Sequence, residues 1–332
     1  MKGSEKVSYS KFLKGLNSLI ATNNFDSFYY DLEPTDDNDT YDLIAEVKEN
    51  ETTTFLKLGV HYDDLYKSGA LVNLTKKGLL FGNDITSLDM VFGDNVRFDF
   101  NYLIDKGFYW SIGLRSRYNA FKKDVNAELL LDDAQITSTG LNKINASLHD
   151  QTNQFYLKTL FRKDFALSLG AEHKRLEITS ETIANTNQDE FVFESTDYGS
   201  VFGNLRLDTY DNKYFPKRGV YFNGDFHTYL FASHFNEDFE SFSIARATAG
   251  YAFSVSPKIS FNLQTGGGFK LGDNSTTTLD FALGGYGNNL INNFIPFYGY
   301  DFISLTGNSY VKAYFSMDYE VFNKHHITVE GN

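Results

Sequence analysis

The sequence has no cysteine, one tryptophan and only four prolines among its 332 residues. Without cysteine there can be no disulfide framework, no catalytic thiol and no cysteine-bound metal. The scarcity of proline leaves long stretches free to pair as continuous strands. No apolar run approaches the roughly 18 residues that a membrane-spanning helix needs, which excludes a helical membrane protein.

Positive charge is also in short supply. Lysine and arginine total 30 against 43 aspartates and glutamates, for a net charge of −13, which argues against nucleic acid as a partner. The seven histidines are scattered, and no two have the helical i, i+4 spacing of a zinc site. We therefore predict no metal and no cofactor. No Gly-x-Ser-x-Gly elbow occurs either, so we predict that this chain is not an enzyme.

Aromatic residues are abundant, with 32 phenylalanines and 22 tyrosines, and they alternate with polar residues. In Val96–Tyr118 this alternation predicts a hairpin that turns at Asp105–Gly107, with one apolar face and one polar face. Each arm is long enough to cross a bilayer as a tilted strand of about 9–11 residues. The predicted lipid-facing residues are Phe98, Phe100, Trp110 and Leu114, and the predicted lumen-facing residues are Arg97, Asp99, Arg115 and Arg117.

Alternation also fits a soluble sandwich, so that alternative stays open at this point. Two features favour a barrel with a polar lumen. Glycines stand among the charges of the polar face, which suits a crowded, curved interior. Short turns also alternate with long polar connections, as in outer-membrane barrels. The predicted long loops are Lys123–Asp150, Ile178–Thr196, Ser233–Ser241 and Gly272–Asn308.

The strand pattern counts to about thirteen between residues 53 and 332, whereas single-chain bacterial barrels normally have an even number. No export signal follows Met1, and the chain stops at Asn332 inside a predicted strand. We therefore expect a fragment that lacks both ends, with about 13 of an expected 16 strands. The first strand, near Phe55, would then lack its closing neighbour.

Residues 1–52 have a different pattern. Apolar residues between Ser8 and Phe25 recur at helical spacing, and alternation over Phe28–Leu32 and Tyr41–Val47 predicts a hairpin that turns at Thr35–Thr40. We expect a small, incomplete α+β unit. Beyond Glu51 the helical signal disappears.

Three stretches resemble motifs of the BamA-like and two-partner-secretion transporter superfamily, also called the bacterial surface antigen superfamily. They are Asn73–Asp84, Asp208–Val220 and Phe281–Gly287 followed by Phe297–Tyr300. Barrels of this superfamily follow POTRA domains, and Ser8–Val47 is similar to the second half of one. The resemblance implies a mostly β fold, with a partial POTRA domain at 1–52 and a transmembrane antiparallel β-barrel at 53–332.

The superfamily's lumen loop has the signature Val-Arg-Gly-Tyr or Phe, and its arginine pairs with acidic residues of the wall. Here the corresponding loop motif is Phe297, Tyr298, Gly299 and Tyr300, so a tyrosine that can only hydrogen-bond stands at the arginine position. Asp318 and Glu320 are candidate lumen-wall acids. They could equally be ordinary lumen carboxylates, balanced by the arginines of the hairpin at 96–118.

Phe297–Tyr300, Leu16–Tyr30 and the closing Lys324–Asn332 are similar to patatin-like phospholipases fused to a BamA-like barrel, a type V secretion-like arrangement. This implies a membrane anchor and export route for an upstream hydrolase. The alternatives are an outer-membrane protein assembly factor, or insertase, and a soluble β-rich surface protein.

The expected location is the bacterial outer membrane. The expected partners are its lipid and lipopolysaccharide and an upstream passenger domain in cis, and a homodimer is a further option. Acidic residues predicted in loops could hold cations that bridge lipopolysaccharide, although solvated carboxylates are the simpler interpretation. These residues are Asp124, Asp132, Asp133, Asp189 and Asp197.

Overall fold

The computed structural model divides into two compact units, Met1–Phe55 and Leu56–Asn332. It describes residues 7–9, 12–13, 15–16, 25–35, 40–50, 52–63, 65–131, 133–183, 190–234, 239–272, 276–286 and 293–332. Among these residues, no helix is long and apolar enough to cross a membrane.

The first unit contains the predicted hairpin. Strand β1 (Phe25–Pro34) pairs antiparallel with β2 (Tyr41–Glu49). The Phe12 amide donates to the Ser8 carbonyl over 3.0 Å, a helical contact, and the Phe12 ring lies 5.2 Å from that of Tyr30. Most of the predicted helix falls outside the described residues, so the POTRA assignment and the boundary at residue 52 stay predictions.

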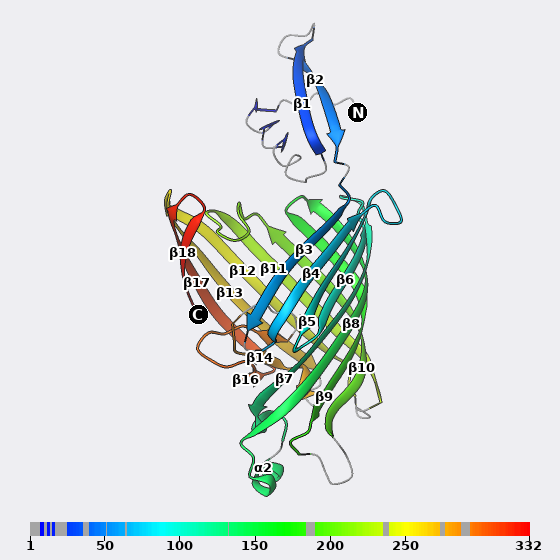
Figure 1. The fold of residues 1–332 in the computed structure, drawn as a ribbon, viewed down its shortest axis with the longest axis vertical. Helices are drawn as coiled ribbons and strands as arrows, with labels where there is room; N and C mark the ends of the chain where they lie inside the picture. Colours follow the sequence, from blue (N-terminus) through cyan, green and yellow to red (C-terminus); the bar gives the residue numbers. More distant parts are fainter. Residues whose placement is uncertain are drawn as a thin grey trace. The chain divides into compact units, whose positions relative to one another are not determined.

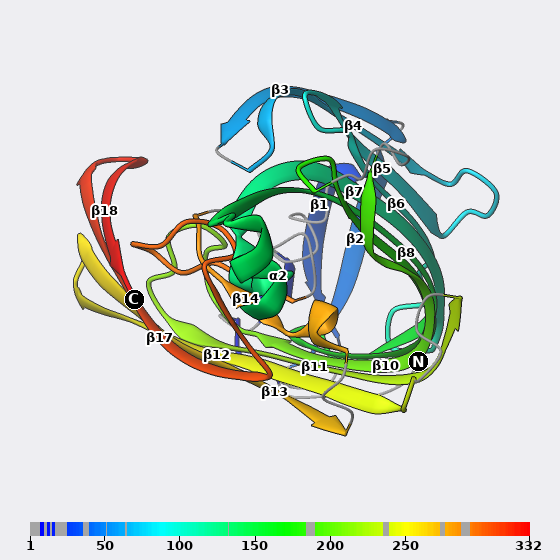
Figure 2. The ribbon, with the colours of Figure 1, turned by 90° about the horizontal axis from the view of Figure 1, so that it is seen from below.

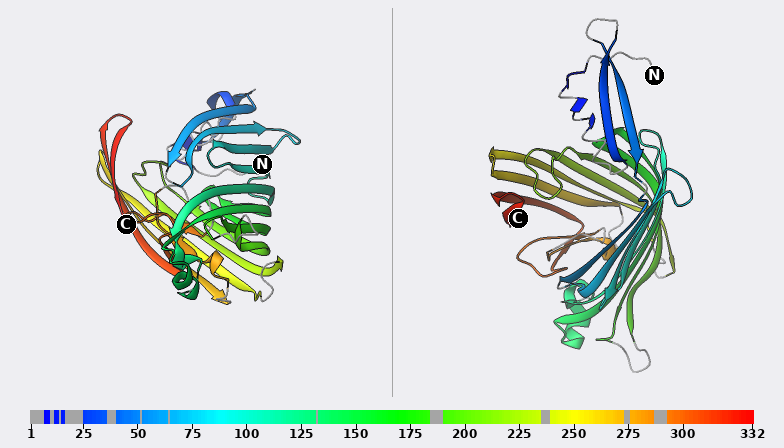
Figure 3. Two further views of the ribbon diagram at one scale, coloured as in Figure 1. Left: turned by 60° about the horizontal axis from the view of Figure 1, so that its bottom comes forward. Right: turned by 45° about the horizontal axis from the view of Figure 1, so that its top comes forward.

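The second unit is built around one sheet of thirteen strands in which each strand pairs with its neighbours in sequence order (Figures 1, 2 and 3). This confirms the predicted count. No pairing joins the edge strands β3 and β18 among the described residues, so closure and a total of 16 strands stay predictions. The strands are β3 (Thr54–Asp63), β4 (Lys67–Lys77), β5 (Asp84–Gly93), β6 (Arg97–Ile104), β7 (Ser111–Asn126), β8 (Lys143–Arg162), β9 (Phe165–Ser180), β10 (Phe191–Asp208), β11 (Gly219–His234), β12 (Phe242–Ser256), β13 (Ile259–Gly272), β17 (Ser309–Phe322) and β18 (His325–Gly331).

Several strands extend well into the predicted loops. Strands β7 and β8 pair as far as Asn126 and Lys143, inside the expected loop 123–150, and β9 and β10 likewise occupy much of 178–196. Their polar outer faces made these segments resemble loops. These polar side chains instead form hydrogen bonds between neighbouring strands. For example, the Asn145 side-chain amide donates to the Asp124 carboxylate over 2.7 Å. The connection between β7 and β8 also contains a short helix, α2 (Asp133–Thr139). The sequence shows no helical pattern beyond Glu51, so this helix was not predicted.

Much of the hairpin at residues 96–118 has the predicted facing, although Phe98 also borders the interior cavity. Asp99 stands opposite Arg117, and both line an interior cavity, while Phe100 and Leu114 lie on the other face of the sheet. The return strand begins later than expected. Strand β7 starts at Ser111, so Phe108 and Trp110 belong to the turn and not to a strand face.

An apolar core lies inside the curve of the sheet near the long connections. Alternate residues of β7, β8 and β9 face inward there as Phe121, Leu148 and Ile178. Phe294 and Phe302, from the connection between β13 and β17, pack against the same core. The interior at this end therefore contains an apolar cluster, which the prediction of a polar lumen did not include.

Candidate functional site in the lumen

The connection between β13 and β17 folds back inside the wall. It contains a 3-10 turn, η2 (Thr277–Leu279), and a small sheet of β14 (Phe281–Leu283), β15 (Phe294–Ile295) and β16 (Leu305–Gly307). Viewed along the wall, the orange segment that holds β14 lies within the curve of the large sheet (Figure 2). We call residues 276–308 the lumen loop.

Buried polar contacts hold the base of the lumen loop to the wall. The Lys270 ammonium lies 2.7 Å from an Asp280 carboxylate oxygen, and it also donates to the Thr276 carbonyl. The Thr278 hydroxyl donates to the Glu194 carboxylate over 2.8 Å. Because Lys270 and Glu194 are buried on β13 and β10, these contacts connect the loop to two separate parts of the wall.

The two stretches of the lumen loop that resemble superfamily motifs are hydrogen-bonded to each other. Gly285 receives the Phe297 amide on its carbonyl, and its own amide donates to the Tyr300 carbonyl over 2.8 Å. Gly285 has a φ of 75°, and a Cβ there would lie 2.3 Å from the Phe302 ring, so only glycine fits. Gly299 also has a positive φ, 87°, between Tyr298 and Tyr300.

Tyr298 is the loop residue that contacts the last strand. Its hydroxyl donates to a Glu330 carboxylate oxygen over 2.9 Å, and its amide donates to the Asn332 side chain over 2.6 Å. Burial, together with the hydrogen bond to Glu330, raises the pKa of the Tyr298 hydroxyl well above its usual value. Tyr298 therefore remains protonated, and its hydroxyl is a neutral donor where the family's signature has a cation.

The structure does not bring Tyr298 to Asp318 or Glu320. Asp318 lies 2.8 Å from the Nδ1 atom of His326, and Glu320 lies 2.6 Å from the Lys217 ammonium in the turn between β10 and β11. Both acids are on the same face of β17 as Tyr314 but nearer the short-turn end. Sequence reasoning missed Glu330, although alternation places it on the same face as Thr328 and His326.

Beside Tyr298 lies a cavity of about 770 Å³ with mixed charge. Arg97 and Arg117 line it together with Asp99 and Glu330. The Arg97 guanidinium lies 3.6 Å from the centre of the Tyr66 ring, a cation–π contact. Such a lining can solvate a polar chain of either charge. The described residues contain no cluster of three or more potential metal ligands.

Deeper in the wall, the charged residues pair with one another. The Lys174 ammonium lies 2.6 Å from Asp150, and both side chains are almost fully buried. His227 lies between Asp225 and Glu172, with nitrogen–oxygen distances of 3.2 and 3.6 Å. These pairs cross strands β8, β9 and β11, so they connect the strands of the wall from its inner side.

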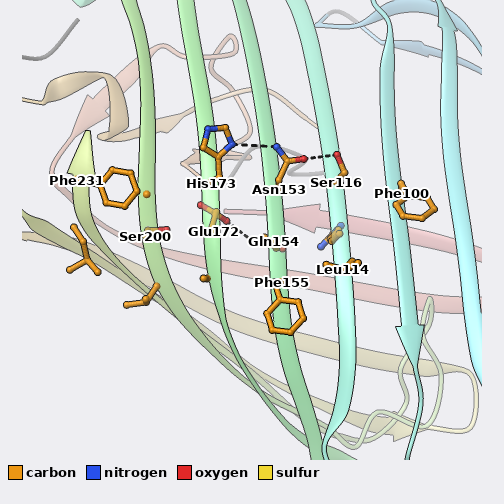
Figure 4. Close-up of a pocket in the computed structure, with 15 residues that line it drawn as sticks. Phe100, Leu114, Ser116, Asn153, Gln154, Phe155, Glu172, His173, Ser200 and Phe231 are labelled. Atoms are coloured by element: carbon orange, nitrogen blue, oxygen red, sulfur yellow. Dashed lines mark hydrogen bonds between the residues drawn. The ribbon is translucent and has the colours of Figure 1, made fainter. Parts of the chain in front are cut away.

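The outer face has a groove of about 650 Å³ where polar side chains meet an apolar band (Figure 4). The Ser116 hydroxyl donates to Asn153, whose amide nitrogen lies 3.4 Å from His173 (Figure 4). Leu114 and Phe155 lie beside this chain on the same face. The predicted loop acid Asp197 is in β10 and contacts His173 and Arg175; Asp132 and Asp189 lie outside the described residues.

A transmembrane wall of long strands with an apolar outer face, a charged interior and an inward loop defines a transporter-type outer-membrane β-barrel. Residues 41–332 match the family model described as the OMP85 superfamily, and the chain belongs to that superfamily. Its location is the bacterial outer membrane, so the soluble alternative is wrong. A comparison with curated protein sequences finds no match.

Solved structures with a similar fold include two kinds of protein. BamA from Haemophilus ducreyi lacking POTRA domains 1–3 is 12% identical with a TM-score of 0.59, and the match covers 98% of this chain and 64% of the BamA chain. CdiB from Acinetobacter baumannii is 13% identical with a TM-score of 0.56, covering 99% and 59%. CdiB from Escherichia coli is 11% identical with a TM-score of 0.61, covering 94% and 56%. The chain thus spans less than two thirds of these proteins.

The contact between Tyr298 and Glu330 gives a first prediction. Tyr298→Phe should release the loop tip from β18, because it removes the hydroxyl that donates to Glu330. Losing a hydrogen bond to a charged group costs about 1.5–3 kcal/mol, or roughly tenfold or more in the loop's open population. In the cysteine-free chain, a Tyr300→Cys variant reports this as faster labelling by a water-soluble maleimide.

Tyr310→Phe is the matched control. Tyr310 is a tyrosine of β17 that also contacts the lumen loop, because its ring packs on Phe281 with centres 4.8 Å apart. Labelling of Tyr300→Cys should be unchanged in this background. Equal labelling in the Tyr298→Phe and unaltered backgrounds would show that the hydroxyl contact does not hold the loop.

Proposed function

We propose that this chain is the outer-membrane anchor and export route of a longer protein, with its passenger in cis. The observation behind this proposal is the neutral contact between Tyr298 and Glu330 beside a cavity of mixed charge. One hydroxyl makes one hydrogen bond, whereas an arginine can make two parallel, charge-assisted bonds to a carboxylate. A loop held in this way can be displaced by a passing polypeptide at lower cost.

The passenger that the resemblance suggests is a patatin-like phospholipase domain. Support comes from Leu16–Tyr30, Phe297–Tyr300 and Lys324–Asn332, the stretches similar to patatin-fused barrels. In this proposal the hydrolase supplies its own serine nucleophile and aspartate. The barrel itself contributes no catalytic residue; it places the hydrolase at the membrane that contains its phospholipid substrate.

An insertase is the second candidate, and the BamA-like fold is the observation that favours it. An insertase folds other barrels without chemistry, so it needs no catalytic domain. The two candidates therefore differ in what the same polypeptide contains before residue 1.

The native gene product distinguishes the two functions. An antibody against this chain should detect a band in outer membranes well above the 37.8 kDa of these 332 residues. In-frame DNA before Met1 should encode a signal peptide and a Gly-x-Ser-x-Gly elbow, and the purified product should hydrolyse phospholipid esters. Replacing the elbow serine by alanine should abolish hydrolysis without loss of the folded barrel. An upstream frame that encodes only further POTRA domains would contradict the proposal and favour the insertase.

A further inference from the structure

The turn between β4 and β5 has an unusual composition for a connection in water. Residues 78–83 read Gly-Leu-Leu-Phe-Gly-Asn and contain no charge. Leu79, Leu80 and Phe81 are 52, 71 and 56% exposed. Figures 1 and 2 show this cyan turn projecting sideways beyond the wall, away from the interior. Three large apolar side chains are thus presented at the outside of the sheet.

The neighbouring turn, between β6 and β7, presents three more. Phe108, Tyr109 and Trp110 are 63, 78 and 46% exposed. The two turns are connected, because the Asn83 side-chain amide donates to the Asp105 carbonyl over 2.8 Å and the Asp105 amide donates to the Asn83 carbonyl over 3.0 Å. We call Leu79, Leu80, Phe81, Phe108, Tyr109 and Trp110 the apolar turn pair.

A buried carboxylate holds the first turn in this conformation. Asp84 is 1% exposed and accepts the backbone amides of Leu79, Leu80 and Phe81 over 2.6, 2.7 and 2.8 Å. The Tyr102 hydroxyl donates to the same carboxylate over 2.9 Å. With the amides turned toward Asp84, the apolar side chains point outward. Their exposure is therefore a property of an ordered turn.

The apolar turn pair lies at the short-turn end of the wall, and this position favours lipid as its binding partner. Outer-membrane barrels have their short turns on the periplasmic side, so these turns border the inner leaflet. Aromatic residues concentrate at this boundary because one part of the ring is apolar and the other is wetted. Lys76 and Lys106 flank the two turns, and cations there suit anionic lipid headgroups.

We propose that the apolar turn pair inserts sideways into the headgroup–acyl boundary of the inner leaflet, so that it binds glycerophospholipid as a monotopic element beside the strands. Through it, the barrel would fix its depth in the bilayer on the β4–β7 side of the wall. This role does not depend on what the barrel exports or inserts.

A tryptophan placed in the turn can report the insertion. The protein contains a single tryptophan, Trp110, so Trp110→Phe combined with Phe81→Trp leaves one probe at the tip. The test uses the full-length product, with any tryptophan outside these 332 residues replaced by phenylalanine, in phosphatidylcholine vesicles with and without lipid brominated high on the acyl chain. We expect blue-shifted emission, at least twofold quenching by the brominated lipid and little quenching by aqueous iodide.

Tyr214→Trp in the Trp110→Phe background is the matched control. Tyr214 is 76% exposed in another short turn, between β10 and β11, but it stands beside Asp211, Asn212 and Lys213. This probe should be quenched by iodide and not by brominated lipid. If Phe81→Trp behaves in the same way, the turn lies in water. If neither agent quenches it, a protein partner covers the turn, and either result overturns the proposal.

Discussion

Lys174→Met should be among the most damaging single substitutions in the wall, lowering the free energy of unfolding by about 3–5 kcal/mol. The Lys174 ammonium lies 2.6 Å from Asp150, and the side chains are 2 and 1% exposed. Removing the cation leaves a buried carboxylate whose second oxygen already has no hydrogen-bond partner. Urea titration of the protein folded in lipid vesicles measures the change.

Two further variants show whether charge or packing is responsible. Lys122→Met breaks an exposed pair with Glu181 and should cost no more than about 1 kcal/mol. Lys174→Met combined with Asp150→Leu removes both charges, and should recover most of the loss because no unpaired carboxylate remains. If the double variant is no more stable than Lys174→Met alone, the lost packing of the lysine stem explains the effect.

Phe100→Arg should cost about 2–4 kcal/mol, the penalty for a cation on the lipid face of a barrel near mid-bilayer. Phe100 stands in the middle of β6, opposite Leu88 and Ser116, on the face away from the cavity. The measurement is the folded fraction in vesicles as a function of urea. In cells, the same variant should reach the outer membrane at a lower level.

Ser87→Arg is the control for this second prediction. Ser87 is one residue from Leu88 on β5, but it faces the interior on the same side as Asp89. A cation there has water and a carboxylate for neighbours, so we expect a change below about 1 kcal/mol. If Ser87→Arg is as damaging as Phe100→Arg, the two faces of the wall have been assigned the wrong way round.

The parts of the fold that depend on local alternation could be predicted from the sequence. Phe100 between polar neighbours predicts a strand with two unlike faces, and the structure places Phe100 on the outer face and Arg97 and Asp99 on the inner face. The first hairpin, over Phe28–Val47, was predicted in the same way. Each of these hairpins joins two strands that are adjacent in sequence, so the local pattern is enough to predict their pairing.

The remainder depends on contacts between distant residues. Tyr298 and Glu330 are 32 positions apart, and no motif relates them. The extensions of β7 and β8 look like polar loops because their outer faces present polar residues such as Asp124 and Asn145, which pair across the strands. The apolar core around Phe121 joins distant strands and includes Leu279 of the lumen loop, so local alternation does not reveal it.

The most direct test of the central claim, a wall with lipid on one side and a polar interior on the other, is a spin-label scan of β7. Single cysteines at Ile112, Leu114 and Ser116, and at Arg115, Arg117 and Asn119, are labelled in vesicles in the full-length protein, from which any cysteine outside these 332 residues has been removed. We predict high collision rates with oxygen at the first three positions, which face outward, and with a water-soluble nickel complex at the last three. Equal access of the nickel complex to both sets would contradict a membrane-spanning wall.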